Sequence, residues 1–358
     1  MNRMFKGKSV RRALALSGLS VLLFAGSQGL AQAATLKLAT VAPEGSQWMK
    51  TMRAGADEIK ARTDGRVQIK LYGGGVMGAD KSMLRKMRIG QLHGGAFVAS
   101  GLSSVYPAIN IYSLPLVFHS QEEIDYVRAR MDEKLLAGLE SEGLVSFGFA
   151  GGGFAKILSN SPVRSLDDLK GQKVWVPEGD RVGYEAMESL GLSPVTLPLT
   201  DVMTGLQTGL IDIVATSPVG AVVFQWYTKV KYVTELPVVY VFATMIVDGK
   251  AFARLSAEDQ VVVREVMSRV YREFNAQSIP DNKGAYEALL ANGIESVVPG
   301  EASVADLHQR AWDVAADMVK EGLIEQQMLD ELKKHLASFR ASQVDQKQAA
   351  ATAERTDK

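Results

Sequence analysis

The sequence contains no cysteine in its 358 residues, which excludes disulfide bonds, thiolate metal ligands and a cysteine nucleophile. Long apolar runs are missing after the first 33 residues, so no later segment reaches the roughly 18 residues that a membrane-spanning helix needs. Histidine is scarce, and no H-E-x-x-H motif occurs, which argues against a zinc site. We expect the histidines to be isolated residues of the surface or of helix faces: His93, His119, His308 and His335.

The N-terminal residues have the pattern of a secretory signal peptide. Basic residues at positions 3–12 precede the apolar run Ala13–Ala25, and Ala31-Gln32-Ala33 supplies small residues for cleavage. We therefore expect residues 1–33 to be removed and the protein to be exported to the periplasm. The remaining chain has 35 Lys and Arg against 40 Asp and Glu, a net charge of −5. This charge argues against a nucleic-acid partner, which requires a basic face.

Two segments have residues typical of catalytic or cofactor-binding motifs but lack the rest of the motif. Gly73–Gly78 reads G-x-G-x-x-G between a strand and a helix, yet no acidic residue follows around 93–103 to hold a ribose. Gly101–Ser104 contains serines but no G-x-S-x-G nucleophile elbow. We therefore expect no enzyme activity, no cofactor and no metal. Gly73–Gly78 is better interpreted as a glycine-rich turn whose amides face a binding cleft.

Strand-like and helix-like segments alternate along the mature chain, which is typical of parallel βαβ units and predicts the α/β fold class. The expected strands are 36–41, 67–72, 97–100, 145–150, 158–160, 173–176, 194–197, 213–215, 230–233 and 236–241. The expected helices are 46–63, 81–91, 121–141, 182–190 and 201–208, and the chain is nearly all helical after Ser256. Gly151–Gly153 is a candidate crossing between two lobes. Residues 341–358 are polar and alanine-rich, and we expect a disordered tail.

Five separated segments carry a resemblance to a known family. They are Val41–Ser46 with the Trp48 helix that follows, Arg66–Gly78, Met87–Gln91, Ser165–Pro177 and Leu199–Asp212. In this order they resemble the extracytoplasmic solute-binding subunit of TRAP (tripartite ATP-independent periplasmic) transporters, typified by C4-dicarboxylate-binding proteins. The resemblance runs over most of residues 35–320, and the last two segments are the strongest matches.

The resemblance implies a two-lobed α/β fold of the periplasmic-binding-protein type, with crossing strands, a hinge and a long bridging helical region. We expect lobe I to contain residues 34–157 and 244–283, and lobe II to contain residues 158–243 and 284–340. The implied mechanism is closure of the lobes on a small organic ligand, which is then delivered to the small and large membrane subunits of a TRAP permease. We expect a monomer, although residues 301–339 are long enough for a helix exchanged between subunits.

The chain departs from the family where the ligand is held. Most members place an arginine before the proline of the 173–177 segment, and that arginine pairs with the ligand carboxylate through two hydrogen bonds. This position is Trp175 here. Ser217 stands where an amide usually helps to hold the carboxylate, and a second family arginine is missing from the Gly153–Leu158 strand. Arg181 or Lys156 could substitute, although such residues are more often a solvated helix-start arginine and a strand-surface lysine.

Trp175 could be a wall of the cleft or a core residue, and the resemblance favours the wall. Tryptophan offers an apolar face and one N–H donor, and an unpaired carboxylate buried beside it would cost free energy. The expected ligand is therefore larger and more apolar or aromatic than a small dicarboxylate, with at most one acid group. The residues expected to contact it are Trp175, Ser217, Phe154, Lys156, Arg181, Glu44, Trp48, Gly75, Ser100, Gln225 and Tyr240. A sensor protein for a signalling receptor and a carrier of lipid-like cargo remain as alternatives.

Overall fold

The computed structural model describes the backbone of residues 33–356 and the side chains through residue 345. The predicted signal peptide lies outside the described residues, except for Ala33. Within the described part of the chain, no helix has both the length and the apolar character that crossing a membrane requires. From Ala34 onward the described chain is one compact unit, in which two lobes share a mixed sheet.

The shared sheet has eight strands in the order β2-β1-β3-β9-β5-β8, with β4 and β10 also paired to β9. The strands are β1 (Ala34–Ala39), β2 (Val67–Tyr72), β3 (Gly94–Val98), β4 (Leu144–Ser146), β5 (Ala150–Ser159), β8 (Ile213–Thr216), β9 (Tyr232–Asp248) and β10 (Glu295–Val297). β1 is parallel to β2 and β3, whereas β9 is antiparallel to β3, β4 and β5. The three parallel strands end at one edge, so the loops that follow them gather there.

Lobe II adds a parallel pair of short strands, β6 (Trp175–Pro177) and β7 (Val195–Leu197). A bridge between Val174 and Ile213 connects this pair to the shared sheet. Both strands end beside the loops that lead into the next helices. The loops after β6 and β7 therefore gather at one edge, as the loops after β1, β2 and β3 do in the shared sheet.

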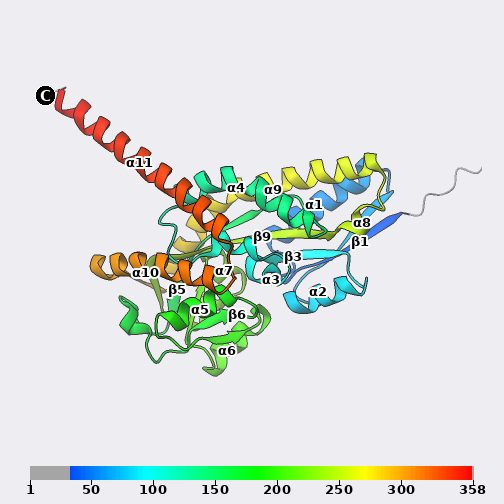
Figure 1. Cartoon of the computed structure of the whole chain (residues 1–358). Coiled ribbons are helices and arrows are strands. Elements are labelled where there is room, and N and C mark those ends of the chain that lie inside the picture. Colours follow the sequence, from blue (N-terminus) through cyan, green and yellow to red (C-terminus); the bar gives the residue numbers. More distant parts are fainter. Residues whose placement is uncertain (1–32, 357–358) are drawn as a thin grey trace, which may run out of the picture. The chain divides into compact units, whose positions relative to one another are not determined.

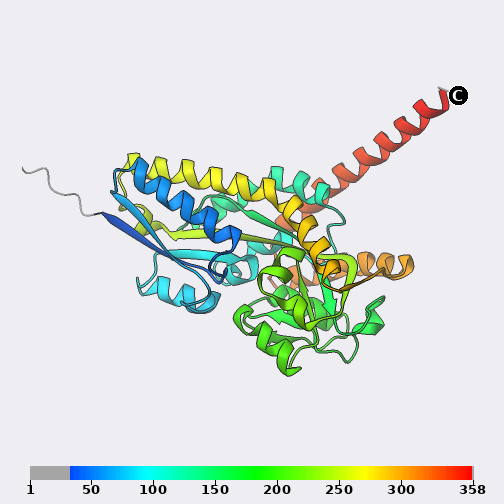
Figure 2. The same ribbon diagram turned by 180° about the vertical axis from the view of Figure 1, so that it is seen from behind.

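Helices pack against the sheets, and Figures 1 and 2 show them from opposite sides. The α-helices are α1 (Gln47–Arg62), α2 (Asp80–Arg88), α3 (Ala99–Leu102), α4 (Gln121–Ser141), α5 (Arg181–Ser189), α6 (Val202–Thr208), α7 (Pro218–Val223), α8 (Gly249–Phe252), α9 (Ala257–Ala291), α10 (Glu301–Lys320) and α11 (Gln326–Thr356). The 3₁₀ helices are η1 (Pro107–Ser113), η2 (Leu166–Leu169), η3 (Leu199–Asp201) and η4 (Trp226–Lys229). Serine N-caps begin three of the longer helices, because the side chains of Ser46, Ser120 and Ser256 each accept a backbone hydrogen bond from the first turn.

β5 and β9 carry the chain between the lobes. β9 is 17 residues long and pairs with β10 near its start and with β3 near its end. The segment predicted as a crossing, Gly151–Gly153, lies inside β5, and the predicted strand 158–160 is the end of that same strand. Glycine is required at Gly151, because a β-carbon there would lie 2.3 Å from the hydroxyl oxygen of Tyr240.

α9 is the long helix that spans both lobes, and it contains Pro280 in its interior. Its first half packs on α1 of lobe I, and its second half packs on α7 of lobe II. Proline removes one helical hydrogen bond and clashes with the preceding turn, so the two halves need not share one axis. The long bridging helix implied by the resemblance is therefore present.

Two expectations about the C-terminal region are wrong. Residues 341–356 continue α11 instead of forming a disordered tail, because alanine, glutamine and lysine are good helix formers. Residues 326–340 were also expected in lobe II, but α11 packs on α4 and η1 of lobe I. Ion pairs of Lys134 with Glu331 and of Arg340 with Glu123 hold it there. α10, by contrast, packs on α5 of lobe II.

Candidate functional site

The loops of lobe I that follow β1 and β2 are bound to each other by Glu44. One oxygen of this carboxylate accepts a hydrogen bond from the amide of Gly73 at 3.2 Å, and Arg53 Nη2 lies 2.8 Å from both oxygens. The hydrogen bond from Arg53 lowers the pKa of Glu44 below its ordinary value. Glu44 therefore positions the glycine-rich loop, and its charge is already paired with Arg53.

The glycine-rich loop has a backbone that few other residues could adopt. The φ angles of Gly74, Gly75 and Gly78 are +63°, +70° and +86°. The amide of Gly74 donates to the carbonyl of Ala42 at 2.7 Å, and the amide of Gly75 donates to that of Thr40 at 3.1 Å. Because protein carbonyls already accept from these amides, the loop is not a phosphate cradle. Its amides close the loop instead of facing a cleft.

Loops of the two lobes meet at the predicted ligand edge. A β-carbon at Gly75 would lie 3.1 Å from Thr200 Cγ2, and one at Gly179 would lie 3.5 Å from the carbonyl oxygen of Ser100. Lys81 Nζ of lobe I lies 3.7 Å from Glu178 Oε1 of lobe II. The candidate site is thus the place where the chain after β2 and β3 faces the chain after β6 and β7.

Asp80, beside Lys81, shows how closely the lobes approach. Burial, together with the charge of Glu178, raises the pKa of Asp80 to about 7. Its carboxylate lies against Gly101, where a β-carbon would be 2.1 Å from Asp80 Oδ2. The contact with Gly101 is within lobe I, whereas the charge of Glu178 comes from lobe II, so a carboxyl group with a raised pKa lies near the junction of the lobes.

The structure places Trp175 in the core of lobe II. The residue is 5% exposed, its indole N–H donates to the carbonyl of Leu197 at 3.0 Å, and its ring meets the ring of Trp226 edge-on at 5.3 Å. Of the two interpretations of Trp175, as a cleft wall or as a core residue, this conformation corresponds to the core residue. Contact with a ligand would require the ring to leave this packing. The physical reason is that the N–H is already satisfied and the apolar faces are already covered.

The two candidate cations differ in their availability. Lys156 Nζ pairs with Glu235, whose carboxylate also accepts from Tyr286 and Ser296, and it lies 4.9 Å from the centre of the Tyr286 ring. Burial opposes ionisation of Glu235, but these hydrogen bonds lower its pKa overall. Arg181, at the first position of α5, is 65% exposed and lies 3.8 Å from Glu185. Arg181 is therefore the candidate that can still turn toward a ligand.

Ser217 acts as the N-cap of α7, since its hydroxyl accepts from the amide of Gly220 at 3.2 Å. The next turn is tied to α9, because the amide of Val219 donates to Asn282 Oδ1 at 3.3 Å. Asn282 Nδ2 in turn donates to the carbonyl of Gly152 at 2.9 Å. Gln225 is exposed in the turn after α7. Ser217 therefore has a structural role in the present conformation, at the place where α7, β5 and α9 meet.

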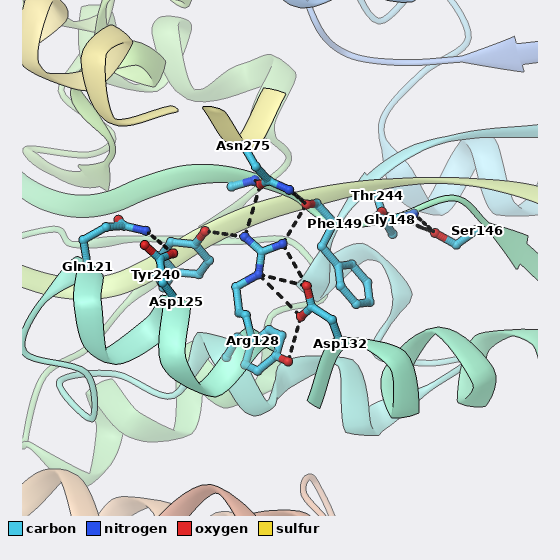
Figure 3. A network of polar contacts seen from close by, with 12 residues as sticks. Gln121, Asp125, Arg128, Asp132, Ser146, Gly148, Phe149, Tyr240, Thr244 and Asn275 are labelled. Atoms are coloured by element: carbon cyan, nitrogen blue, oxygen red, sulfur yellow. Dashed lines mark hydrogen bonds and ion pairs between the residues drawn. The ribbon is translucent and has the colours of Figure 1, made fainter. Parts of the chain in front are cut away.

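Tyr240 belongs to a buried polar network, which Figure 3 shows. Its hydroxyl accepts a 2.9 Å hydrogen bond from Arg128 Nη1, and the ring of Phe154 packs edge-on against it at 5.5 Å. Arg128 also donates to Asp132, to the carbonyl of Phe149 and to Asn275 Oδ1. Every polar group here finds a partner within the protein, so the network fixes the start of β5 and leaves Tyr240 1% exposed.

The predicted site residues therefore separate into two groups. Gly75, Ser100 and Arg181 lie at or next to the junction of the lobes, with Glu44 holding the adjoining loop. The other residues pack elsewhere in this conformation, including Trp48, whose ring stacks on Phe274 at 5.8 Å. The sequence interpretation missed Arg128, Asn275 and Asn282. The only signal for Arg128 was a charged residue on the apolar face of the helix predicted at 121–141.

Two of the surface grooves in the described part of the protein are lined by no predicted site residue. One, of about 310 Å³, lies between α1 and α9, and the other, of about 290 Å³, lies between α5 and α10. Charged side chains line much of both, among them Arg269 and Glu58 in the first and Glu188 and Asp317 in the second. Among the described residues, no group of three or more His, Asp or Glu side chains could hold a metal ion.

Comparison with known proteins agrees with this architecture. The model of the family described as bacterial extracellular solute-binding protein, family 7, matches residues 38–321. The chain belongs to this family. Its members are the solute-binding proteins of TRAP transporters, which are receptors and not enzymes. The resemblance and the two-lobed α/β fold predicted from the sequence are thus confirmed.

Individual relatives are distant in sequence. A solute-binding protein of Chromohalobacter salexigens is 28% identical over 214 residues, which cover 59% of this chain and 62% of that protein. A solved TRAP solute-binding protein of Xanthobacter autotrophicus, with bound β-D-galacturonate, matches with a TM-score of 0.76 and 23% identity over 84% of this chain and 99% of that one. A solute receptor of Bordetella pertussis that binds pyroglutamic acid matches with a TM-score of 0.77 and 23% identity over 84% and 100%. At these identities the structures show a shared fold.

Proposed function

We propose that this protein captures a small organic ligand between its two lobes in the periplasm and delivers it to the membrane subunits of a TRAP permease. The observation that supports the proposal most directly is that Gly75 lies close to Thr200, and Ser100 lies close to Gly179, where the two lobes approach each other. These loops follow parallel strands of both lobes, which is where ligands of open α/β sheets bind. The family to which the chain belongs supports delivery to a permease.

The ligand that we propose carries a single acid group on a larger neutral or aromatic body. No arginine stands on β6, and Lys156 is already paired with Glu235, so the described site offers less positive charge than a dicarboxylate needs. Arg181 can meet one carboxylate through two parallel hydrogen bonds. Solved relatives with bound galacturonate, orotic acid or pyroglutamic acid support a ligand with one carboxylate.

A thermal-shift screen followed by calorimetry tests this proposal. The probes are D-galacturonate, orotate, pyroglutamate and succinate, added to the exported protein after dialysis. We expect one of the monoacids to raise Tm and to bind at micromolar concentration, and we expect succinate to have no effect. Micromolar binding of succinate would contradict the ligand class, and a response to none of the probes would contradict the proposed ligand set.

Arg181→Ala then tests the cation. We expect it to weaken binding of the monoacid at least tenfold, because a charge-assisted pair to a carboxylate is lost. Arg310→Ala is the matched control, since Arg310 is an exposed arginine on α10 that pairs with Asp306 of its own helix. Equal affinities for the two variants would show that Arg181 does not contact the ligand.

A further inference from the structure

Two histidines that are far apart in the sequence lie together in the structure. The rings of His119, just before α4, and His308, on α10, stack with their centres 3.8 Å apart and their planes 11° apart. The expectation that these histidines are isolated from each other is therefore wrong. The stack joins the N-terminal end of α4 in lobe I to the α10 helix, which packs on lobe II.

The charged groups beside the stack are Arg340 of α11 and Glu123 of α4. Arg340 Nε and Nη2 donate to the two oxygens of Glu123 at 2.7 and 2.9 Å, and Nη2 also donates to the carbonyl of Val117 at 3.0 Å. Glu123 accepts a further hydrogen bond from the amide of His119 at 2.8 Å. The carboxylate is thus paired with Arg340 and with the backbone, and it is 5% exposed.

His119 is exposed and His308 is half-buried, but the charge of Arg340 disfavours a positive charge on either imidazole. Within the described part of the protein, the buried His308 Nε2 has no hydrogen-bond partner. Partial burial of the ring, followed by the charges of Arg340 and of the neighbouring His308, lowers the pKa of His119 to about 4. Burial and Arg340 also lower the pKa of His308. Both rings are therefore neutral at neutral pH, and the stack is a contact between uncharged aromatic faces.

We propose that the His119–His308 stack is an acid-opened clasp that fastens α10 and α11 to lobe I. When the rings are neutral, they stack and Arg340 remains on Glu123. When they take up protons, two like charges face each other beside a third charge, and the clasp opens. Because α10 packs on α5 of lobe II and α11 packs on α4 of lobe I, opening loosens a connection between the lobes.

The direction of the pH effect follows from the lowered pKa values. A histidine with a pKa near 4 in the clasp and near its ordinary value of about 6.5 outside it favours the closed clasp at neutral pH. This preference is complete above pH 6.5 and is lost as the pH falls toward 4. The pKa of Glu123 is lowered as well, despite its burial, because Arg340 donates hydrogen bonds to it. A loss between pH 6.5 and 4.5 is therefore assigned to the histidines and not to Glu123.

Hydrogen exchange of the intact mature protein, corrected for the intrinsic rate at each pH, tests the clasp. Between pH 7 and 4.5 we expect protection of peptides from α10 and from residues 326–340 of α11 to fall by about tenfold or more. Protection of α1 and of the first half of α9 should change little. Unchanged protection of α10 and α11 over this range would overturn the proposal.

Two variants keep the test independent of folding. His119→Phe with His308→Phe retains two stacked rings that cannot take up protons, and we expect it to remove the acid-dependent loss. If that pair does not fold, the single variant His308→Gln should reduce the loss. His93→Gln is the control, because His93 lies near β1, where its Nδ1 accepts from the amide of Lys37, and the loss should persist. An acid-dependent loss of protection that persists in the variant with both His119→Phe and His308→Phe would contradict the clasp. Where only His308→Gln folds, an undiminished loss of protection in that variant would contradict it. Imidazole pKa values near 6.5, measured by NMR, would also contradict it.

Discussion

Arg128 Nη1 donates a 2.9 Å hydrogen bond to the hydroxyl of Tyr240, and this bond ties a helix of lobe I to the strand that crosses into lobe II. The same guanidinium donates to the carbonyl of Phe149, one residue before β5 begins. Asn275 of α9 completes the arrangement, because it donates to that carbonyl and accepts from the amide of Gly151. Four elements thus share one buried polar network at the start of the crossing strand (Figure 3).

Replacement of Arg128 should be strongly destabilising. Arg128→Ala leaves the Asp132 carboxylate with the hydroxyl of Tyr112 but without its cation, and it removes the partner of the Tyr240 hydroxyl. Breaking such a buried pair costs about 3–5 kcal/mol. We expect a loss of this size in the free energy of unfolding, measured by urea titration. Arg130→Ala, two residues along the same helix, changes an exposed arginine and should cost less than about 0.5 kcal/mol. Similar losses for the two variants would contradict a special role of the network.

Replacement of Trp175 distinguishes a core residue from a ligand wall. Trp175→Ala removes a ring that packs against Trp226, and we expect a loss of about 3–5 kcal/mol in unfolding free energy. Trp48→Ala, at a ring that is less buried, should cost less. The informative variant is Trp175→Phe, which we expect to lose some stability and to retain ligand affinity. Normal stability combined with lost affinity would instead place this ring at the ligand.

Asp80 should make stability fall as the pH rises. Its pKa is about 7 in the folded protein and near 3.8 when exposed, so the folded state holds a proton that the unfolded state has released. Stability is therefore greatest below pH 4 for this group and declines as the pH rises through 7. Asp80→Asn should remove that decline, and at pH 8 it should be more stable than the native protein by about 1–3 kcal/mol.

The measurement for Asp80 is the midpoint of thermal unfolding at pH 5, 6, 7 and 8. Asp64→Asn is the control, because the side chain of Asp64 is 87% exposed. If the difference in unfolding midpoint between Asp80→Asn and the native protein is the same at all four pH values, Asp80 ionises normally.

Much of the fold was accessible from the sequence, because it depends on local periodicity. The strand predicted at 67–72 and the helix predicted at 121–141 coincide with β2 and α4. β5 was divided into separate pieces, since Gly151–Gly153 has no strand propensity of its own. These glycines are paired to β9 because only they fit beside Tyr240 and Asn282, which are distant in sequence.

The candidate site was harder to predict from the sequence. Whether a charged side chain can bind a ligand depends on its partners in the fold, and the sequence does not show which residues those are. Lys156 and Arg181 looked alike as candidate cations, yet only the structure shows Glu235 and Tyr286 around the first. Trp175 was placed correctly on its strand, but the direction of its ring is decided by Trp226 and by the carbonyl of Leu197. Residue positions followed from the resemblance, whereas side-chain partners did not.

Gly153 should tolerate no side chain, because two independent constraints act on it. Its φ angle is +84°, and a β-carbon would lie 2.6 Å from Asn282 Nδ2, which donates to the neighbouring carbonyl of Gly152. Gly153→Ala should therefore cost about 1–3 kcal/mol and break the link from β5 through Asn282 to Val219 of lobe II. Hydrogen exchange should show faster opening at the start of α7. Gly191→Ala is the matched control, since Gly191 has a φ of +75° with open space around it, and it should cost only the backbone strain. If Gly153→Ala and Gly191→Ala lose the same free energy of unfolding and hydrogen exchange at α7 is unchanged, the contact with Asn282 does not stabilise the link between β5 and lobe II.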